Sequence, residues 1–100
     1  MKLKAGVKLE GASWRVWHAA LVAEDVLAGY GSDLVVTSVC DGKHSERSLH
    51  YKGLALDIRT RTLKANKSEA VVVAHLKTAL SPDYDVVLEG DHIHIEYDPK

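Results

Sequence analysis

The last part of the chain carries the pattern that most restricts its fold: two six-residue segments, 84–89 and 92–97, are joined by Gly90-Asp91. This spacing is typical of a hairpin with a tight turn. Successive side chains of a strand point to opposite faces of the sheet. In the final segment, Ile93, Ile95 and Tyr97 therefore share one face, and His92, His94 and Glu96 share the other. We expect the apolar face of this hairpin to pack on helices and its polar face to stay open.

Two segments have the periodicity of helices that could cover such a sheet. The first runs from Ser13, a suitable N-cap, to about Tyr30, and the second opens at Asn66, where Glu69 completes a capping box, and stops before Pro82. The apolar residues of the first helix that we expect in the core are Trp14, Trp17, Leu21 and Leu27. Both segments are long enough to form core-packing helices.

Three further segments have the pattern of strands: 2–9, 34–39 and 54–60. The first alternates apolar residues with lysine, the second is β-branched, and the third alternates again. With 100 residues, the chain is expected to form one domain over residues 1–100. The predicted fold class is α+β, with a small, mostly antiparallel sheet and two main helices packed on one face.

Candidate metal ligands occur in two separate groups. His50 and Asp57 stand seven residues apart across Gly53, and His92 and His94 stand two apart in the final strand. Imidazole nitrogen and carboxylate oxygen are the ligands of catalytic zinc, and three of these side chains could close around one ion. An odd separation would place His50 and Asp57 on opposite faces of a regular strand, so we expect a bend or bulge at Gly53. The zinc site is then predicted on the sheet face opposite the helices.

The composition excludes several other classes. The formal net charge is −1 and the basic residues are scattered, which does not favour nucleic-acid binding. Cys40 is the only cysteine, so the chain cannot form an intramolecular disulfide. No segment has the pattern of a secretory signal or a membrane span. We expect a cytoplasmic monomer that does not insert into membranes.

The two groups of candidate ligands together resemble a known family. The first has the form Ser-x-His-x-x-Gly-x-Ala-x-Asp, carried by Ser48, His50, Gly53, Ala55 and Asp57, and a His-x-His follows. This resembles the zinc D,D-peptidases, the bacterial and phage peptidoglycan peptidases that share a fold with the Hedgehog signalling domain and include D-Ala-D-Ala carboxypeptidases and phage endolysins. The resemblance covers roughly the second half of the chain. Two motifs in this order are more specific than either alone.

The resemblance implies a role for each matching residue. The zinc ligands would be His50, Asp57 and His94, with a water molecule in the fourth position. Asp91 falls on the family's catalytic carboxylate, and His92 on the histidine that stabilises the oxyanion. Ser48 matches a serine near the substrate backbone. Glu89 lies across the turn from His92 and remains an alternative base.

This chain departs from the family at the arginine that grips a substrate carboxylate. At the corresponding place it reads Val39-Cys40-Asp41-Gly42-Lys43, and we consider Arg47, Lys43 and Arg59 as replacements. The predicted function is a zinc-dependent peptidase cleaving peptidoglycan stem or cross-link peptides, with carboxypeptidase and endopeptidase action both open. Such an enzyme would reach the cell wall after release from the cytoplasm. The alternatives are a non-catalytic zinc-binding module of the same fold and a phage structural module.

Overall fold

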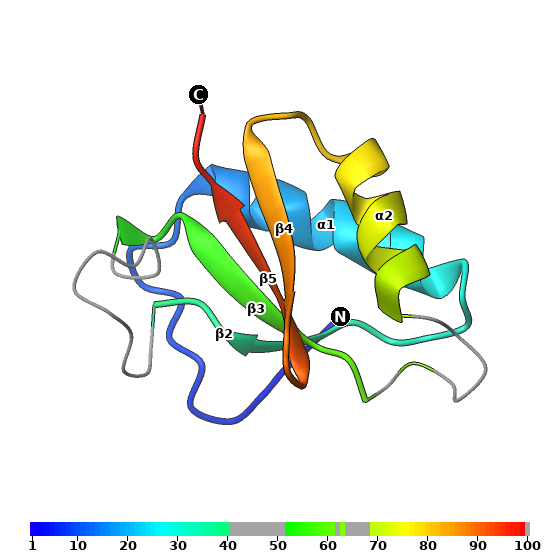
Figure 1. The fold of residues 1–100 in the computed structure, drawn as a ribbon. Coiled ribbons are helices and arrows are strands. Elements are labelled where there is room, and N and C mark those ends of the chain that lie inside the picture. Colours follow the sequence, from blue (N-terminus) through cyan, green and yellow to red (C-terminus); the bar gives the residue numbers. More distant parts are fainter. Residues whose placement is uncertain (41–51, 62, 64–68, 100) are drawn as a thin grey trace.

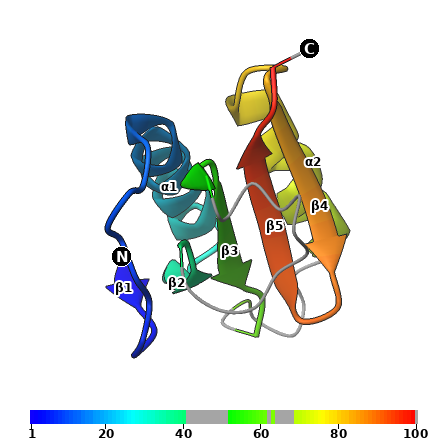
Figure 2. The same ribbon diagram turned by 90° about the vertical axis from the view of Figure 1, so that its left-hand side faces the viewer.

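Five strands and two helices make up the part of the chain that the computed structural model describes, residues 1–40, 52–61, 63 and 69–99. They are β1 (Lys2–Leu3), α1 (Trp14–Ala28), β2 (Val35–Ser38), β3 (Ala55–Arg59), α2 (Glu69–Ala79), β4 (Tyr84–Glu89) and β5 (His92–Tyr97). The strands form one mixed sheet in the order β1-β2-β3-β5-β4, with β1 and β4 at its edges (Figure 2). Only the β1–β2 pair is parallel among these strands. The prediction of a small α+β domain is therefore confirmed.

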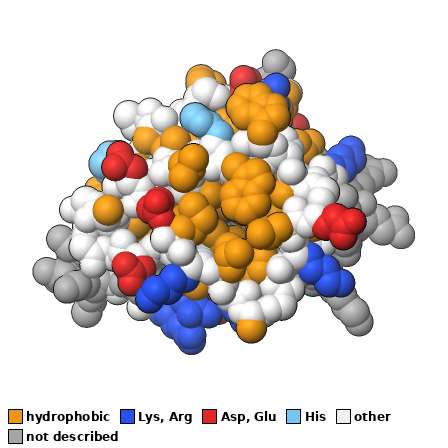
Figure 3. Space-filling view, turned by 180° about the vertical axis from the view of Figure 1, so that it is seen from behind, with side chains coloured by type: hydrophobic (Ala, Val, Ile, Leu, Met, Phe, Trp, Pro, Cys, Tyr) orange, Lys and Arg blue, Asp and Glu red, His pale blue; other side chains and the backbone are white. Residues whose placement is uncertain are grey.

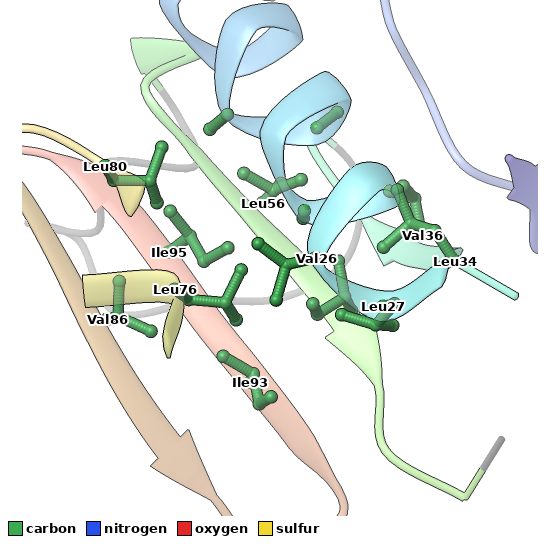
Figure 4. Packing of buried hydrophobic residues seen from close by; sticks show 14 of the residues in the cluster. Val26, Leu27, Leu34, Val36, Leu56, Leu76, Leu80, Val86, Ile93 and Ile95 are labelled. Atoms are coloured by element: carbon green, nitrogen blue, oxygen red, sulfur yellow. The ribbon is translucent and has the colours of Figure 1, made fainter. Parts of the chain in front are cut away.

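Both helices lie on the same side of the sheet (Figure 1). Leu56, Ile58, Ile93 and Ile95 on the sheet are almost fully buried, as are Leu27 of α1 and Leu76 of α2. Figure 4 shows Leu56, Ile93 and Ile95 of the strands meeting Leu27 and Leu76 of the helices. Removal of this apolar surface from water is the main stabilising contribution. The hairpin was predicted with the bounds observed for β4 and β5. In β5, Ile93 and Ile95 are buried as the alternation predicts, and the polar residues of the opposite face are half-buried.

Helix α1 packs with a different face from the one we predicted. Trp14, Trp17 and Leu21 are 65%, 37% and 61% exposed. The buried stripe instead consists of Val16, Ala19, Ala20, Ala23, Val26 and Leu27. Alanines let the helix axis approach the sheet closely, whereas an indole on that side would hold it away. From the helix side, Figure 3 shows hydrophobic side chains gathered on the surface. Our expectation that the tryptophans are core residues was wrong.

The start of the chain also differs from the prediction. A strand over residues 2–9 was expected, but β1 contains only Lys2–Leu3. Gly6 adopts φ +90°, and the Val7 amide donates to the Lys4 carbonyl at 3.2 Å, so the chain turns after β1. The predicted start of the second helix at Asn66 lies outside the described residues. In the described part of the chain, neither helix is long and apolar enough to cross a membrane.

Candidate metal and catalytic site

The register of β3 against β5 brings two predicted zinc ligands together. Asp57 lies directly opposite His94, Arg59 opposite His92, and Ala55 opposite Glu96. Side chains opposite one another in a ladder share a face of the sheet. This face is the one turned away from the helices, because Leu56, Ile58 and the two isoleucines of β5 occupy the other. We call this set of side chains the polar ladder.

His94 is held between two carboxylates in the polar ladder. Its Nδ1–H donates to Asp57 Oδ1 and its Nε2–H donates to Glu96 Oε1, each at 2.8 Å. The hydrogen bond to Asp57, aided by the one to Glu96 and opposed by burial, raises the pKa of His94 from 6.5 to about 9. Without a metal, the ring is therefore protonated at neutral pH and donates from both nitrogens.

Asp57 is buried, with 8% of the residue exposed, and it lies on a central strand with β2 on one side and β5 on the other. Ser38 of β2 is its partner on the other strand, next to a bulge, and the Thr37 hydroxyl donates to the Asp57 carbonyl at 3.3 Å. A carboxylate so far from water needs a partner, and His94 supplies it. Asp57 is therefore fixed in position before any ligand binds.

Gly53 produces the bend that the sequence predicted before β3. It adopts φ +69°, and a Cβ built on it would lie 2.0 Å from the carbonyl oxygen of Gly11. The Gly53 carbonyl also accepts from the Ser13 amide at 2.8 Å, which joins the bend to the start of α1. No side chain fits at this contact, and the left-handed conformation favours glycine as well. The bend predicted at Gly53 is therefore present.

The third predicted ligand, His50, lies outside the described residues, as do Ser48, Arg47 and Lys43. Within the described ranges, a single group of three acidic, His or Cys side chains has ligand atoms within 4.8 Å of one another, namely Asp85, Glu96 and Asp98. Exposed acidic groups often cluster in this way without an ion. A three-ligand site on Asp57 and His94 therefore needs a donor from elsewhere in the chain, which is the role predicted for His50.

The donor set at Asp57 and His94 fits zinc. One carboxylate oxygen and one imidazole nitrogen face each other, and both are normal zinc ligands. Glu96 accepts a hydrogen bond from Nε2, the other ring nitrogen of His94. A ligating histidine commonly donates its second N–H to a carboxylate in this way. A zinc ion would replace the proton on Nδ1, since a ligating nitrogen must be deprotonated.

The two predicted catalytic residues lie beside this pair. His92 Nε2 is 3.9 Å from Asp57 Oδ2, and His92 Nδ1 donates to Asp91 Oδ1 at 3.1 Å. The hydrogen bond from His92 lowers the pKa of Asp91, so this carboxyl is ionised at neutral pH. Glu89, the alternative base, is opposite His92 in the β4–β5 ladder, and its side chain is exposed. Asp91 is thus the carboxylate in hydrogen-bond contact with His92.

Thr60 holds the turn that carries Asp91, and sequence reasoning missed this residue. The Thr60 hydroxyl and amide both donate to the Asp91 carbonyl, at 2.8 and 3.2 Å. Thr60 is buried, so these bonds are shielded from water. The position of Thr60 directly after β3 was the only available signal, because the partner lies 31 residues away.

The comparisons with known proteins assign no family. No protein-family model matches the chain, and no curated protein is significantly similar to it.

Proposed function

We propose that the chain is a zinc-dependent peptidase that cleaves peptidoglycan stem or cross-link peptides, with a fold of the Hedgehog and D,D-peptidase type. One observation carries the proposal: Asp57 and His94 come from two motifs far apart in the sequence, and their ligand atoms lie 2.8 Å apart on the polar face. Glu96 supports the second nitrogen of the same ring. The pair supplies two of the donors that our zinc site needs, with a carboxylate on the second ring nitrogen as ligating histidines commonly have.

In this proposal His50, Asp57 and His94 hold the ion. When bound, zinc would polarise the scissile carbonyl and lower the pKa of a coordinated water toward about 7. The buried Asp57 keeps its place through the neighbouring strands, and Glu96 fixes the orientation of the His94 ring. The ligand set is thereby preorganised before substrate arrives.

Proton transfer and charge stabilisation fall to the residues at the turn. The Asp91 carboxylate accepts a proton from the attacking water and passes it to the leaving amine. His92 lies between Asp91 and Asp57. In its doubly protonated form it donates from Nδ1 to Asp91 and from Nε2 toward the oxygen on which negative charge develops. Thr60 keeps the backbone of Asp91 in place while its side chain acts. We further propose that the chain works as a monomer and reaches the cell wall after release from the cytoplasm.

A non-catalytic zinc-binding module of the same fold is the second candidate. One observation favours it: the side chain of Asp91 is 99% exposed, whereas catalytic bases commonly lie in water-excluded sites. Ligation by Asp57 and His94 would be the same in both candidates. Activity, rather than metal content, separates them.

The test is hydrolysis of purified peptidoglycan by the zinc-loaded protein, with new termini identified by mass spectrometry. We expect Asp91→Asn to retain zinc and to lose about 10²-fold or more in rate, the usual contribution of a general base. Asp25→Asn, an exposed carboxylate on α1, is the matched control and should keep full activity. Parent-level activity in Asp91→Asn would show that our base is wrong. Zinc binding without any hydrolysis would favour the non-catalytic module.

A further inference from the structure

Strand β4 forms one edge of the sheet, and within the described residues β5 is the only strand that pairs with it. Figure 2 shows β4 on the opposite side of the sheet from β1. The pairing with β5 runs without a bulge from Tyr84 to Glu89. β4 contains neither lysine nor proline, the residues that commonly protect an edge, whereas the other edge, β1, is two residues long and carries a lysine. β4 is therefore a long, regular edge at which a further strand can pair.

The register shows which backbone groups of β4 point away from β5. In an antiparallel ladder, hydrogen-bonded pairs of residues alternate with pairs whose amides and carbonyls point outward. The Asp98 amide donates to the Asp83 carbonyl at 2.8 Å, which makes these two opposed residues a hydrogen-bonded pair. Counting along the ladder from this pair, Val86 and Leu88 fall in the alternate pairs. Their amides and carbonyls therefore point to the open edge.

The charges carried by this edge strand are negative. Asp85 and Glu89 lie opposite Glu96 and His92, so both side chains point to the face of the polar ladder. Val87 lies between them on the same face and is 46% exposed. β4 contains no basic residue. A strand added at this edge would therefore place its alternate side chains beside an acid, a valine and a second acid.

A cleft of about 430 Å³ follows the same edge. Val73 and Ala74 of α2 line it on one side. Val86 and Val87 both line it from β4, although neighbouring side chains of a strand point to opposite faces, so the cleft reaches round the edge. Lys77 is the one charged side chain in the described part of this lining. The side chains of an added strand that point toward α2 would therefore lie against largely apolar surface.

We propose that β4 binds an extended, basic peptide segment of a partner protein as an additional strand of the sheet, an interaction that goes beyond the proposed function. The backbone of the segment forms hydrogen bonds with the outward groups of Val86 and Leu88, as in other cases of strand addition. Its side chains on the polar face are a basic residue beside Asp85, an apolar residue beside Val87 and a basic residue beside Glu89. The two residues between these are apolar, because they point toward the cleft beside α2.

A second copy of the chain fits this edge less well than a basic peptide. In a two-fold antiparallel pairing centred on Val87, Asp85 of one copy would lie opposite Glu89 of the other. Like charges directly opposite each other destabilise a sheet. The bound segment is not the substrate either, because two strand spacings of 4.7–4.9 Å place it about 10 Å from His94.

Peptide titration tests the proposal directly. The probe is the capped peptide acetyl-Lys-Val-Val-Val-Lys-amide, and binding is followed at low salt by proton–nitrogen NMR of the labelled protein. We expect shifts along β4 that are largest at Val86 and Leu88. The same peptide with N-methyl groups on its three valines should bind about ten-fold more weakly, because it cannot donate to the edge. A peptide with glutamate in place of both lysines should bind at least as weakly, because it sets like charges opposite each other.

Variants of the protein complete the design. Leu88→Pro removes an outward amide but no bond of the β4–β5 ladder, and it should weaken binding about ten-fold, whereas Leu88→Val keeps the amide and should bind as the parent does. Glu89→Gln should weaken binding several-fold and make it less sensitive to salt. The exposed Asp25→Asn on α1 is its charge-matched control and should bind as the parent does. Melting curves will show whether each variant is folded, and the N-methylated peptide tests the parent if Leu88→Pro unfolds.

Three results would overturn the proposal. Equal affinity for the probe and for its N-methylated form would exclude strand addition, as would shifts confined to other parts of the molecule. Equal affinity for the lysine and glutamate peptides would exclude a basic partner. Concentration-dependent dimers of the parent that are lost in Leu88→Pro would show that a second copy occupies the edge instead.

Discussion

Replacing Asp57 with asparagine removes one negative charge from the most buried ion pair of the polar ladder and keeps the side-chain shape. In the zinc-free protein, the hydrogen bond to Asp57 is the largest cause of the raised pKa of His94. The asparagine oxygen can still accept from Nδ1, but it no longer attracts the protonated ring as a charge. We therefore expect the pKa of His94 to fall by one unit or more in Asp57→Asn.

The size of the stability effect follows from this pKa. A rise from 6.5 to about 9 corresponds to about 3.4 kcal/mol, at about 1.36 kcal/mol per unit. Glu96 supplies part of the shift, and solvent near the partly exposed ring screens the pair, so Asp57 accounts for a smaller share. We expect Asp57→Asn to lower the free energy of unfolding by about 1–2 kcal/mol at pH 6.

The same reasoning fixes the direction of the pH dependence. His94 binds a proton more tightly in the folded state, so its contribution is fully present below about pH 6.5 and disappears as pH rises through about 9. The gap in stability between the parent and Asp57→Asn should therefore shrink between pH 6 and pH 10. Without this coupling, the gap would not depend on pH.

Two measurements on zinc-free protein check this prediction. Urea unfolding at pH 6 and pH 10 gives the two stability differences, and a proton–nitrogen NMR titration of the imidazole rings gives the pKa of His94. Asp25→Asn is the control for loss of a surface charge. A His94 ring that titrates near 9 in both proteins, or an equal stability gap at both pH values, would refute the pairing described for Asp57 and His94.

Two further substitutions test the frame of the site. Gly53→Ala should lower the free energy of unfolding by about 2–4 kcal/mol, because it combines a strained φ with a 2.0 Å backbone contact. Gly6→Ala has a strained φ but no atom within 4 Å of the new Cβ, so it should cost only about 1 kcal/mol. Equal losses in melting temperature for the two variants would argue against the close approach of Gly53 to Gly11. Thr60→Val should cost about 1 kcal/mol and reduce activity, because the hydroxyl bond to Asp91 is lost. The exposed Thr78→Val serves as its control, and unchanged urea midpoints in both would remove the proposed anchor.

The parts of this structure that the sequence predicted are those set by local periodicity. In β5, strict alternation determines which side chains face the core, and this was enough to place His94 on the face opposite the helices. The turn length fixed the bounds of the hairpin. Once β3 alternates as well, Asp57 must lie on its polar face, and only the register with β5 remained to be found.

The failures arose where two apolar patterns compete or where distant segments meet. In α1, the tryptophans formed one apolar stripe and the alanines another, and the helix buried the smaller side chains because they allow close packing on the sheet. Lys4 and Arg59, for example, line one cleft only because β1 joins the sheet beside β2. No local signature in the sequence links these two residues.

Zinc binding by chelator-treated protein tests the central claim most directly. Calorimetric titration, with metal analysis of the dialysed product, should give one zinc ion per chain for the parent. His94→Gln should bind less than a tenth of an equivalent, since it removes a ligand nitrogen. The double variant Asp85→Asn and Asp98→Asn should keep one equivalent, because neither of these side chains is a ligand in our site. A parent that binds no zinc, or a His94→Gln protein that still binds one ion, would contradict the account.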